Sequence, residues 1–398
     1  MTKKVEVKNL TKIFGKRSPR VKELITQGKT KAEILEQTGA TVGVNQANFH
    51  VNQGEIFVIM GLSGSGKSTL IRMINRLIEP TQGTISIDGQ DLMTLNKKEL
   101  REVRRQKMSM IFQNFALFPN RTILENTAYG LEIKGVEKNV REQKAHEALE
   151  LVGLHGYDHQ FPQQLSGGMQ QRVGLARGLA NDAEILLMDE AFSALDPLNR
   201  KDMQDELLDL QEKMHKTIIF ISHDLNEALR IGDRILIMKD GVIVQTGTPE
   251  DILTHPADDY VKRFIEDVDR TRVLTVANVM IRPNTINIDK DGPRLALRRM
   301  QENEISSVYV VDSARKFVGF ADAKDVVGLI RKESRDLRSV VQTSVPTTHP
   351  DVPVNDLMDK LSSTPIPYAV LDDDHHLVGI IVRGAVLGAI AGNGVAQE

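Results

Sequence analysis

The chain has 398 residues, of which 40% are hydrophobic and 26% are charged, a balance typical of globular domains, and its length predicts two or three of them. A net charge of −3 gives no reason to expect nucleic acid as a partner, and the absence of cysteine excludes disulfides and cysteine-ligated zinc. No apolar run approaches the roughly 18 residues of a membrane span, and the N-terminus lacks the apolar core of a signal peptide, so we expect a cytoplasmic protein that can still bind an integral membrane partner.

Residues 3–13 predict a strand that ends near Phe14, and two short helices then interrupt the pattern within residues 16–43. Their start and stop signals are Ser18, Pro19 and Gly28 for the first helix, and Thr30, Glu33 and Gly39 for the second. The helical pair is an insertion between two strands. It is either a peripheral decoration or a docking surface, and the residues do not decide between the two.

The elements that follow alternate between strand and helix patterns, which predicts an α/β fold. Expected strands are residues 41–51, 55–60, 83–88, 108–112, 184–188, 217–222, 235–239 and 242–246. Expected helices are residues 70–77, 97–105, 170–179, 199–215 and two short ones near 249 and 258–268. Between about residues 114 and 168 the pattern is helical, with helices at 126–133 and 140–152, which indicates a helical subdomain inserted into the α/β core.

Residues 61–69 lie between an apolar strand and a helix start and match the pattern G-x-x-x-x-G-K-[ST]. The glycines let successive backbone N–H groups converge on phosphate oxygens, and the helix N-terminus adds its positive dipole end. Lys67 supplies a positive charge for the β- and γ-phosphates, and Ser68 a hydroxyl for Mg²⁺. The residues expected to bind nucleotide here are Gly61, Ser63, Gly64, Ser65, Gly66, Lys67, Ser68 and Thr69.

Two further motifs carry polar residues where chemistry needs them. A four-residue apolar run ends in Asp189 and Glu190, so a buried strand can deliver one acid to Mg²⁺ beside Ser68 and another to an attacking water. Ser166, with the two glycines after it, begins a helix and so forms a second anion-binding helix N-terminus. A chain needs only one phosphate loop per nucleotide. The second anion-binding site therefore predicts that another molecule takes part, with a second copy of the chain as the candidate.

The last third of the chain repeats itself after a linker at residues 269–275. The strand–turn–strand pattern of residues 307–320 recurs at residues 367–380, so we expect one module at residues 276–336 and a second at 337–398. Each module is too small to bury much apolar surface alone, so the two are expected to pack on one another.

Residues 1–268 resemble the ATP-binding cassette (ABC) family, on six motifs that occur in the family's order. The motifs are residues 61–69, Gln113, residues 165–170, residues 185–190, residues 193–196 and His223. The resemblance implies an ATPase with a phosphate-loop NTPase fold that acts as a head-to-tail homodimer. ATP would lie between residues 61–69 of one copy and Ser166, Gly167, Gly168 and Gln170 of the other.

The resemblance also implies a role for single residues. Glu190, His223 and Gln113 would be catalytic: Glu190 as the base, His223 on the γ-phosphate, and Gln113 on Mg²⁺ and the attacking water. The Mg²⁺ ligands would be Ser68, Gln113 and Asp189. Asp196 would bridge the two copies, and Phe14 would stack on the adenine, although its position alone favours a core phenylalanine at a strand end.

Other residues narrow the resemblance to one group of importers. Residues 118–126 look like import-type ATPases, and residues 16–43, 60–66 and 78–81 resemble the glycine betaine and proline betaine uptake subgroup, whose members also carry tandem cystathionine-β-synthase (CBS) modules. The implied function is osmoregulatory: ATP hydrolysis drives import of a compatible solute through a membrane permease, which is fused to or works with a solute-binding protein. The chain would sit peripherally on the cytoplasmic face of the cell membrane.

The alternative is a soluble ABC ATPase that acts on nucleic acid or ribosomes. Such proteins carry two cassettes or coiled-coil arms, and this chain has one cassette and neither arm. A pull-down with membrane proteins would separate the two hypotheses.

The CBS modules leave three regulators open. Asp325 stands where such modules hold a ribose, but Ala385 takes that place in the second repeat, which departs from the nucleotide-binding pattern. Residues 294–338 carry a net positive charge that an anionic membrane surface would attract less as ionic strength rises. The modules therefore sense ionic strength, a cyclic dinucleotide at their dimer interface, or adenine nucleotides as an energy signal.

Overall fold

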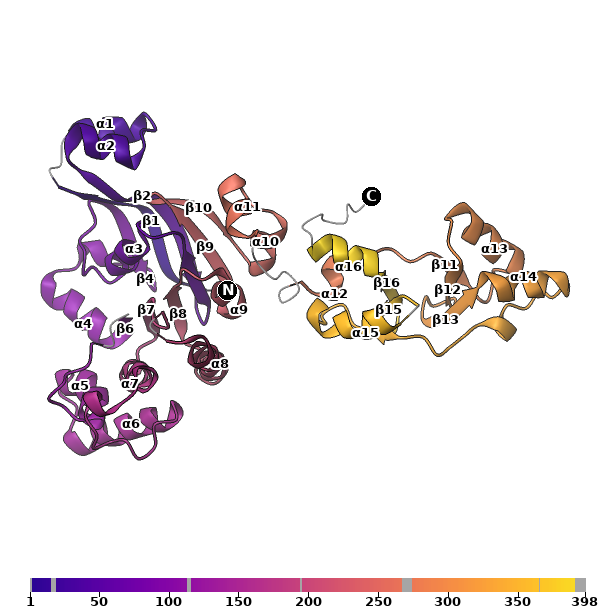
Figure 1. Ribbon diagram of the computed structural model, residues 1–398. Helices are drawn as coiled ribbons and strands as arrows, with labels where there is room; N and C mark the ends of the chain where they lie inside the picture. The colour runs from indigo at the N-terminus through magenta and orange to yellow at the C-terminus, as the bar shows by residue number, and fades with distance from the viewer. Residues whose placement is uncertain are drawn as a thin grey trace. The chain divides into compact units, whose positions relative to one another are not determined.

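The structure is a computed structural model that describes residues 2–15, 19–112, 116–193, 195–266, 274–364 and 366–390. It divides into two compact units, Met1–Val268 and Asp269–Glu398 (Figure 1). Gln113, Ser18 and most of the expected linker lie outside the described residues. The two units are described separately.

The first unit is built on a six-stranded sheet in the order β10-β9-β3-β8-β7-β6. The strands are β3 (Ile56–Met60), β6 (Met108–Phe112), β7 (Ile185–Asp189), β8 (Thr217–Ile221), β9 (Arg234–Lys239) and β10 (Val242–Gly247). All pairings are parallel except that of β10 with β9. Every residue of β3, β7 and β8 is buried, as expected for parallel strands covered on both faces.

A second, antiparallel sheet has the order β2-β1-β4-β5. Its strands are β1 (Lys3–Phe14), β2 (Thr41–Asn52), β4 (Gln82–Ile87) and β5 (Gln90–Asp91). One apolar core joins this sheet to the first and to α3 (Lys67–Ile74), and it includes Leu10, Phe57 and Ile71. The rings of Phe49 on β2 and Phe57 on β3 stack with centroids 5.5 Å apart, so the two sheets contact each other directly.

The insertion between β1 and β2 consists of α1 (Pro19–Thr26) and α2 (Lys31–Thr38). Its own small core includes Val21, Leu24 and Ile34, packed on the ends of β1 and β2. The capping box predicted at Thr30 and Glu33 is present, and Gly39 ends α2 in the left-handed conformation at φ 66°.

The helical region of this unit comprises α5 (Ile123–Ile133), α6 (Lys138–Leu151), the 3₁₀ turn η2 (Pro162–Gln164) and α7 (Gly167–Ala180) (Figure 1). Helix α5 begins three residues before the expected start, because Thr122 and Glu125 form a capping box. The remaining helices are α4 (Lys97–Lys107), α8 (Pro197–Met214), α9 (Leu225–Ile231), α10 (Pro249–Thr254) and α11 (Asp259–Phe264), with η1 (Leu92–Thr94). The seven-residue α9 was not predicted.

The second unit contains two similar three-stranded sheets, β11-β12-β13 and β14-β15-β16. Their strands are β11 (Thr285–Asn287), β12 (Ser307–Val311), β13 (Phe317–Asp322), β14 (Thr347–Thr348), β15 (Tyr368–Leu371) and β16 (Leu377–Ile381). The helices are α12 (Val276–Val279), α13 (Pro293–Glu302), α14 (Ala323–Arg331), α15 (Met358–Ser363) and α16 (Arg383–Ile390), with η4 (Arg338–Val340) and η5 (Val354–Leu357). In each sheet the first pairing is parallel and the second antiparallel, so the repeat in the sequence is a repeat in the structure.

The segment that opens each module packs into the other module. Leu274, Val276 and Val279 belong to the core around β15 and β16, and Leu337 belongs to the core around β12 and β13. The expected modules at residues 276–336 and 337–398 therefore exchange their opening segments, each of which is buried in the core of the other module. The cause is local pairing: the Val276 N–H donates to the Val352 carbonyl at 2.9 Å, and Ile281 forms a β-bridge with Ile380.

Candidate nucleotide-binding site

Four neighbouring parallel strands end at the same edge of the six-stranded sheet. Ile221 at the end of β8 pairs with Ile59 on one side and with Asp189 on the other, and Asp189 pairs with Phe112 at the end of β6. The phosphate loop, Glu190 and His223 therefore all leave this edge. Such an edge is where ligands bind in open α/β sheets.

Glycine is required at two positions of the phosphate loop. Gly61 has φ 145°, and a Cβ there would lie 2.2 Å from the Met238 carbonyl oxygen. Gly66 has φ 109°, and a Cβ there would lie 2.3 Å from the Gly43 carbonyl oxygen. A Cβ atom cannot lie this close to a carbonyl oxygen. The loop can therefore pack against β9 and β2 only if both positions are glycine.

Polar groups inside the loop suit an anion. The buried Lys67 ammonium donates to the carbonyl oxygens of Gly61 (2.7 Å) and Leu62 (3.2 Å), while the buried Ser65 hydroxyl has no hydrogen-bond partner among the described residues. Burial lowers the pKa of Lys67, and the carboxylates of Glu190 and Asp189 act in the opposite direction. A phosphate would give both groups a partner that matches their charge or hydrogen bonding.

The turn between β9 and β10 holds the loop from outside. The Gly241 N–H donates to the Ser65 carbonyl at 2.8 Å, and the Gly241 carbonyl accepts from the Asn45 N–H on β2 at 2.8 Å. The sequence predicts this hairpin but gives no sign that its turn clamps the phosphate loop.

Asp189 connects the loop to the sheet edge. Its Oδ1 accepts from the Ser68 hydroxyl at 2.9 Å and its Oδ2 from the Arg72 guanidinium at 3.1 Å, and the residue is buried. A hydroxyl and a carboxylate this close are the hard oxygen donors that Mg²⁺ prefers, so the pair fits that ion. Arg72 was not predicted, although its spacing of four from Ser68 places it on the same face of α3.

Glu190 directly follows β7 in an unusual backbone conformation, with φ 51°. The Ser193 N–H and hydroxyl donate to the Glu190 carbonyl at 3.2 and 2.9 Å, which holds this turn in place. Its carboxylate Oε2 lies 3.7 Å from Nδ1 of His223. Left-handed residues other than glycine carry strain that concentrates at functional sites, and here the turn directs an acid toward the imidazole.

Phe14 lies at the end of β1, beside the end of the loop. A Cβ on Gly43 would be 2.7 Å from the Phe14 ring and 3.4 Å from the Thr69 methyl group, so both flank the same glycine. The phenylalanine is 39% exposed, and the Lys12 ammonium lies 5.0 Å from its ring centroid. The ring therefore presents a partly exposed flat surface next to the phosphate loop.

The helical insertion also reaches the loop. Lys31, the first residue of α2, donates from its ammonium to the Gly64 carbonyl at 3.0 Å. The sequence left open whether this insertion is peripheral, and this contact ties it to the phosphate loop.

Ser166 caps α7, and its hydroxyl accepts from the Met169 N–H at 3.3 Å. The Gln170 amide donates to the carbonyls of Pro162 and Leu165 at 2.9 and 3.2 Å, so it shapes the turn that leads to Ser166. Ser166 and Gly167 are exposed. A Cβ on Gly168 would meet only ordinary contacts, 3.8 Å or more away, so packing within this chain does not require glycine there.

Asp196 caps α8, where it accepts from the Asn199 N–H at 3.2 Å. Hydrogen bonds from the Asn199 side chain and backbone hold the pKa of Asp196 below its usual value. The carboxylate is exposed and ionised, which leaves it open to a second copy.

A buried acid not predicted from the sequence supports the residue before His223. Glu227 on α9 accepts from the Gln204 amide at 3.0 Å and from the Ser222 hydroxyl. Burial is the largest influence on its pKa and raises it above the ordinary 4.5, although both hydrogen bonds act to lower it.

We expect Glu227→Gln to change how stability depends on pH. A raised pKa means that the folded chain holds this proton more tightly than the unfolded chain, so the contribution is full below pH 4.5 and is lost as the pH rises through the folded pKa. An amide does not titrate. The thermal midpoint of the variant should therefore rise relative to that of the native chain as the pH increases above 4.5. A pH-independent difference between the variant and the native chain would contradict the assignment.

Comparisons with known proteins agree with this geometry. A family model described as "ABC transporter" matches residues 44–193, and one described as "CBS domain" matches residues 276–332 and 337–392. The glycine betaine/carnitine transport ATP-binding protein of Listeria monocytogenes is 62% identical over 392 residues, 98% of each chain. The chain belongs to the ABC transporter family.

Further ABC relatives and structures extend the match. The glycine betaine/proline betaine transport system ATP-binding protein of Escherichia coli is 48% identical over 398 residues, 99% of each chain. The ATP-binding cassette MJ0796, solved as a dimer bound to ADP and Pi, is 33% identical with a TM-score of 0.53, covering 62% of this chain and 98% of that one. The predicted ABC cassette fold, the CBS modules and the ATPase class are thereby confirmed. Within the described residues, no helix has the length and apolar character to cross a membrane.

Proposed function

We propose that this chain is the ATPase subunit that powers uptake of glycine betaine, or a closely related quaternary ammonium osmolyte, through an integral membrane permease. One observation carries the substrate class. Relatives from Listeria, Bacillus subtilis and Escherichia coli match this chain at 62%, 58% and 48% identity over nearly its whole length, and all three are named for glycine betaine transport. The permease and a solute-binding protein would hold the solute, and this chain would sit peripherally on the cytoplasmic face.

The substrate is tested by deleting the gene for this chain and measuring uptake of radiolabelled glycine betaine, carnitine and choline at raised osmolarity. Loss of glycine betaine uptake, restored by the native chain but not by Lys67→Ala, supports the proposal. Unchanged glycine betaine uptake with loss of another solute would overturn it.

The proposed chemistry assigns each group at the sheet edge a role. Residues 61–69 hold the ATP phosphates through backbone N–H groups and Lys67, and Phe14 stacks on the adenine. Ser68 and Asp189 would hold Mg²⁺, with Gln113 as a further ligand, and the ion would supply positive charge at the phosphates. Glu190 accepts a proton from the attacking water, and His223 donates to the γ-phosphate.

The second half of the site comes from another copy of this chain. Ser166 and Gly167 are exposed and, with the half-buried Gly168, form a helix N-terminus that can bind the γ-phosphate of a partner's ATP. Gln170 shapes the turn that leads to it, and Asp196 would lie near the contact. The similar cassette MJ0796 was solved as a dimer, which supports this arrangement.

Gly168→Asp tests the shared site. Its added carboxylate would meet the partner's γ-phosphate with like charge, so ATP-induced dimerisation and hydrolysis should both fall at least about tenfold, while ATP binding to the monomer persists. Light scattering with ATP measures dimerisation. The matched control is Gly328→Asp on α14, where an added Cβ meets no atom within 4 Å. Equal behaviour of the two variants would contradict a site completed by a second copy.

The CBS modules are proposed to regulate the ATPase. A cavity of about 620 Å³ lies between them, lined by Tyr309 and Phe320 from one module and by Ile366, Pro367 and Ile380 from the other. Asp322 lines this cavity, whereas Asp325, singled out from the sequence, does not. A cavity with aromatic and aliphatic walls can hold a planar base. This cavity therefore supports nucleotides as one class of regulator.

Ionic strength is the other proposed regulator. Four basic residues lie at the C-terminal end of α14 and just after it, namely Arg331, Lys332, Arg335 and Arg338. Arg338 pairs with Asp289 at 2.7 Å, so it contributes less unpaired charge than the sequence suggests. Changing all four to glutamine should move activation of transport to lower salt in vesicles with anionic lipid, and have no effect in neutral-lipid vesicles. An unchanged salt threshold would eliminate this cluster as the sensor and leave a nucleotide.

A further inference from the structure

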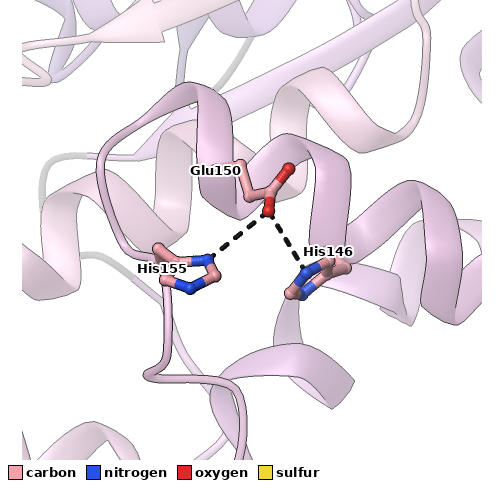
Figure 2. Close-up of side chains that lie close together, drawn as sticks. All are labelled: His146, Glu150 and His155. Atoms are coloured by element: carbon pink, nitrogen blue, oxygen red, sulfur yellow. Dashed lines mark ion pairs between the residues drawn. The ribbon is translucent and has the colours of Figure 1, made fainter.

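Three potential metal ligands converge at the end of α6, away from the nucleotide site. His146 and Glu150 are four residues apart on one face of the helix, and His155 lies in the turn that follows it. Figure 2 shows the two imidazoles on either side of the Glu150 carboxylate. Oε1 of Glu150 lies 3.4 Å from Nε2 of His146 and 3.4 Å from Nδ1 of His155, and the three ligand atoms are all within 4.8 Å of one another.

These separations fit a small tetrahedral ion. Zinc bonds of about 2.0–2.1 Å to nitrogen and oxygen place neighbouring ligands about 3.3 Å apart. Two of the three edges already have that length. The third closes by rotation of His155, whose side chain is 79% exposed.

The Asp158 carboxylate orients the imidazole of His146 from the side opposite Glu150. Nδ1 of His146 lies 2.8 Å from Oδ1 of Asp158, which leaves Nε2 directed at Glu150. Metal-bound histidines characteristically donate their other ring N–H to a carboxylate in this way. Asp158 is itself anchored, because its carbonyl accepts the Leu124 N–H of α5 at 3.0 Å.

We propose that His146, Glu150 and His155 bind one Zn²⁺ ion, oriented by Asp158. Two imidazoles and one carboxylate suit zinc, whereas Mg²⁺ and Ca²⁺ take oxygen ligands. The solvent side is open, so water would fill the remaining position.

Bound zinc would fasten the turn after α6 to that helix. This turn adjoins the helix that carries Ser166: the Arg172 guanidinium of α7 donates to the Val152 carbonyl at 2.9 Å and also pairs with Glu206 of α8. The ion would thus stabilise the connection between α6 and α7, a role that does not depend on which solute is transported.

The test uses the full chain without a histidine tag, stripped with chelator and titrated with Zn²⁺ by calorimetry. We expect one site whose affinity falls at least tenfold in His155→Ala and His146→Ala, and about 10- to 100-fold in Asp158→Asn. His159→Ala, an exposed histidine in the same loop, is the matched control and should bind as the native chain does. Because His155 is exposed, its variant should keep the metal-free thermal midpoint and show that folding is intact.

Cobalt gives a second readout. Co²⁺ in the native chain should produce the intense visible absorption of four-coordinate cobalt, and His155→Ala should lose it. Equal zinc binding by the native chain, His146→Ala and His155→Ala, or no specific site in any of them, would overturn the proposal.

Discussion

Glu190→Gln should lower the rate of ATP hydrolysis about 100-fold or more while leaving ATP binding intact. The amide has nearly the shape of the carboxylate but cannot accept a proton from water. The left-handed turn at φ 51° and the 3.7 Å separation from His223 should persist, because the Ser193 hydroxyl holds the turn through the Glu190 backbone carbonyl, which the substitution leaves unchanged. ATP should therefore remain bound, and the closed dimer should accumulate.

Phosphate release measures the loss of hydrolysis, and light scattering with ATP and Mg²⁺ measures the dimer. Glu212→Gln, an exposed change on α8, is the control and should leave both unchanged. Hydrolysis within a few fold of the native rate would show that another group accepts the proton. Loss of both hydrolysis and nucleotide binding would show that Glu190 has a structural role instead.

Lys67→Ala should weaken ATP binding by about 10- to 100-fold, since a hydrogen bond to a charged group contributes about 1.5–3 kcal/mol. The ammonium is buried inside the loop, held by the carbonyls of Gly61 and Leu62 at 2.7 and 3.2 Å. No other described cation is enclosed by the loop in this way. Equilibrium binding of a fluorescent ATP analogue measures the loss.

Lys31→Ala is the matched control, because Lys31 contacts the same loop from outside, at the Gly64 carbonyl. We expect it to change ATP affinity only a few fold. Equal losses in the two variants would mean that overall charge near the loop matters more than the enclosed position of Lys67. The thermal midpoint without nucleotide must stay near that of the native chain for either comparison to count.

The sequence predicts the parts of this site that depend on local patterns. Residues 56–70 contain the patterns of a buried strand, a glycine-rich turn and a helix start. The buried-strand pattern that ends at Asp189 and Glu190 likewise predicts that these acids lie at the same edge of the sheet as the phosphate loop. Contacts made between distant segments were missed. The contacts of Gly241 with Ser65, of Lys31 with Gly64 and of Gln204 with Glu227 each depend on how elements pack, and no local spacing encodes them.

The CBS modules illustrate the same limit. Strand patterns predict both repeats, because each alternates apolar residues within a few positions. Which core receives residues 274–279 depends on a pairing with residues 350–354, more than seventy positions away. Residues 354–363 form the 3₁₀ turn η5 followed by α15, and Val354 and Leu357 of the first turn are buried in the core.

The exchanged segments have a practical consequence for dissecting the regulatory half of this chain. A cut between residues 336 and 337 would not yield two half-sized domains. One fragment would keep Leu274, Val276 and Val279 without the apolar surface that covers them, and the other would carry away Leu337 from the first core. The two modules share their cores and should unfold as one cooperative unit. A ligand that stabilises one module should therefore stabilise the other as well.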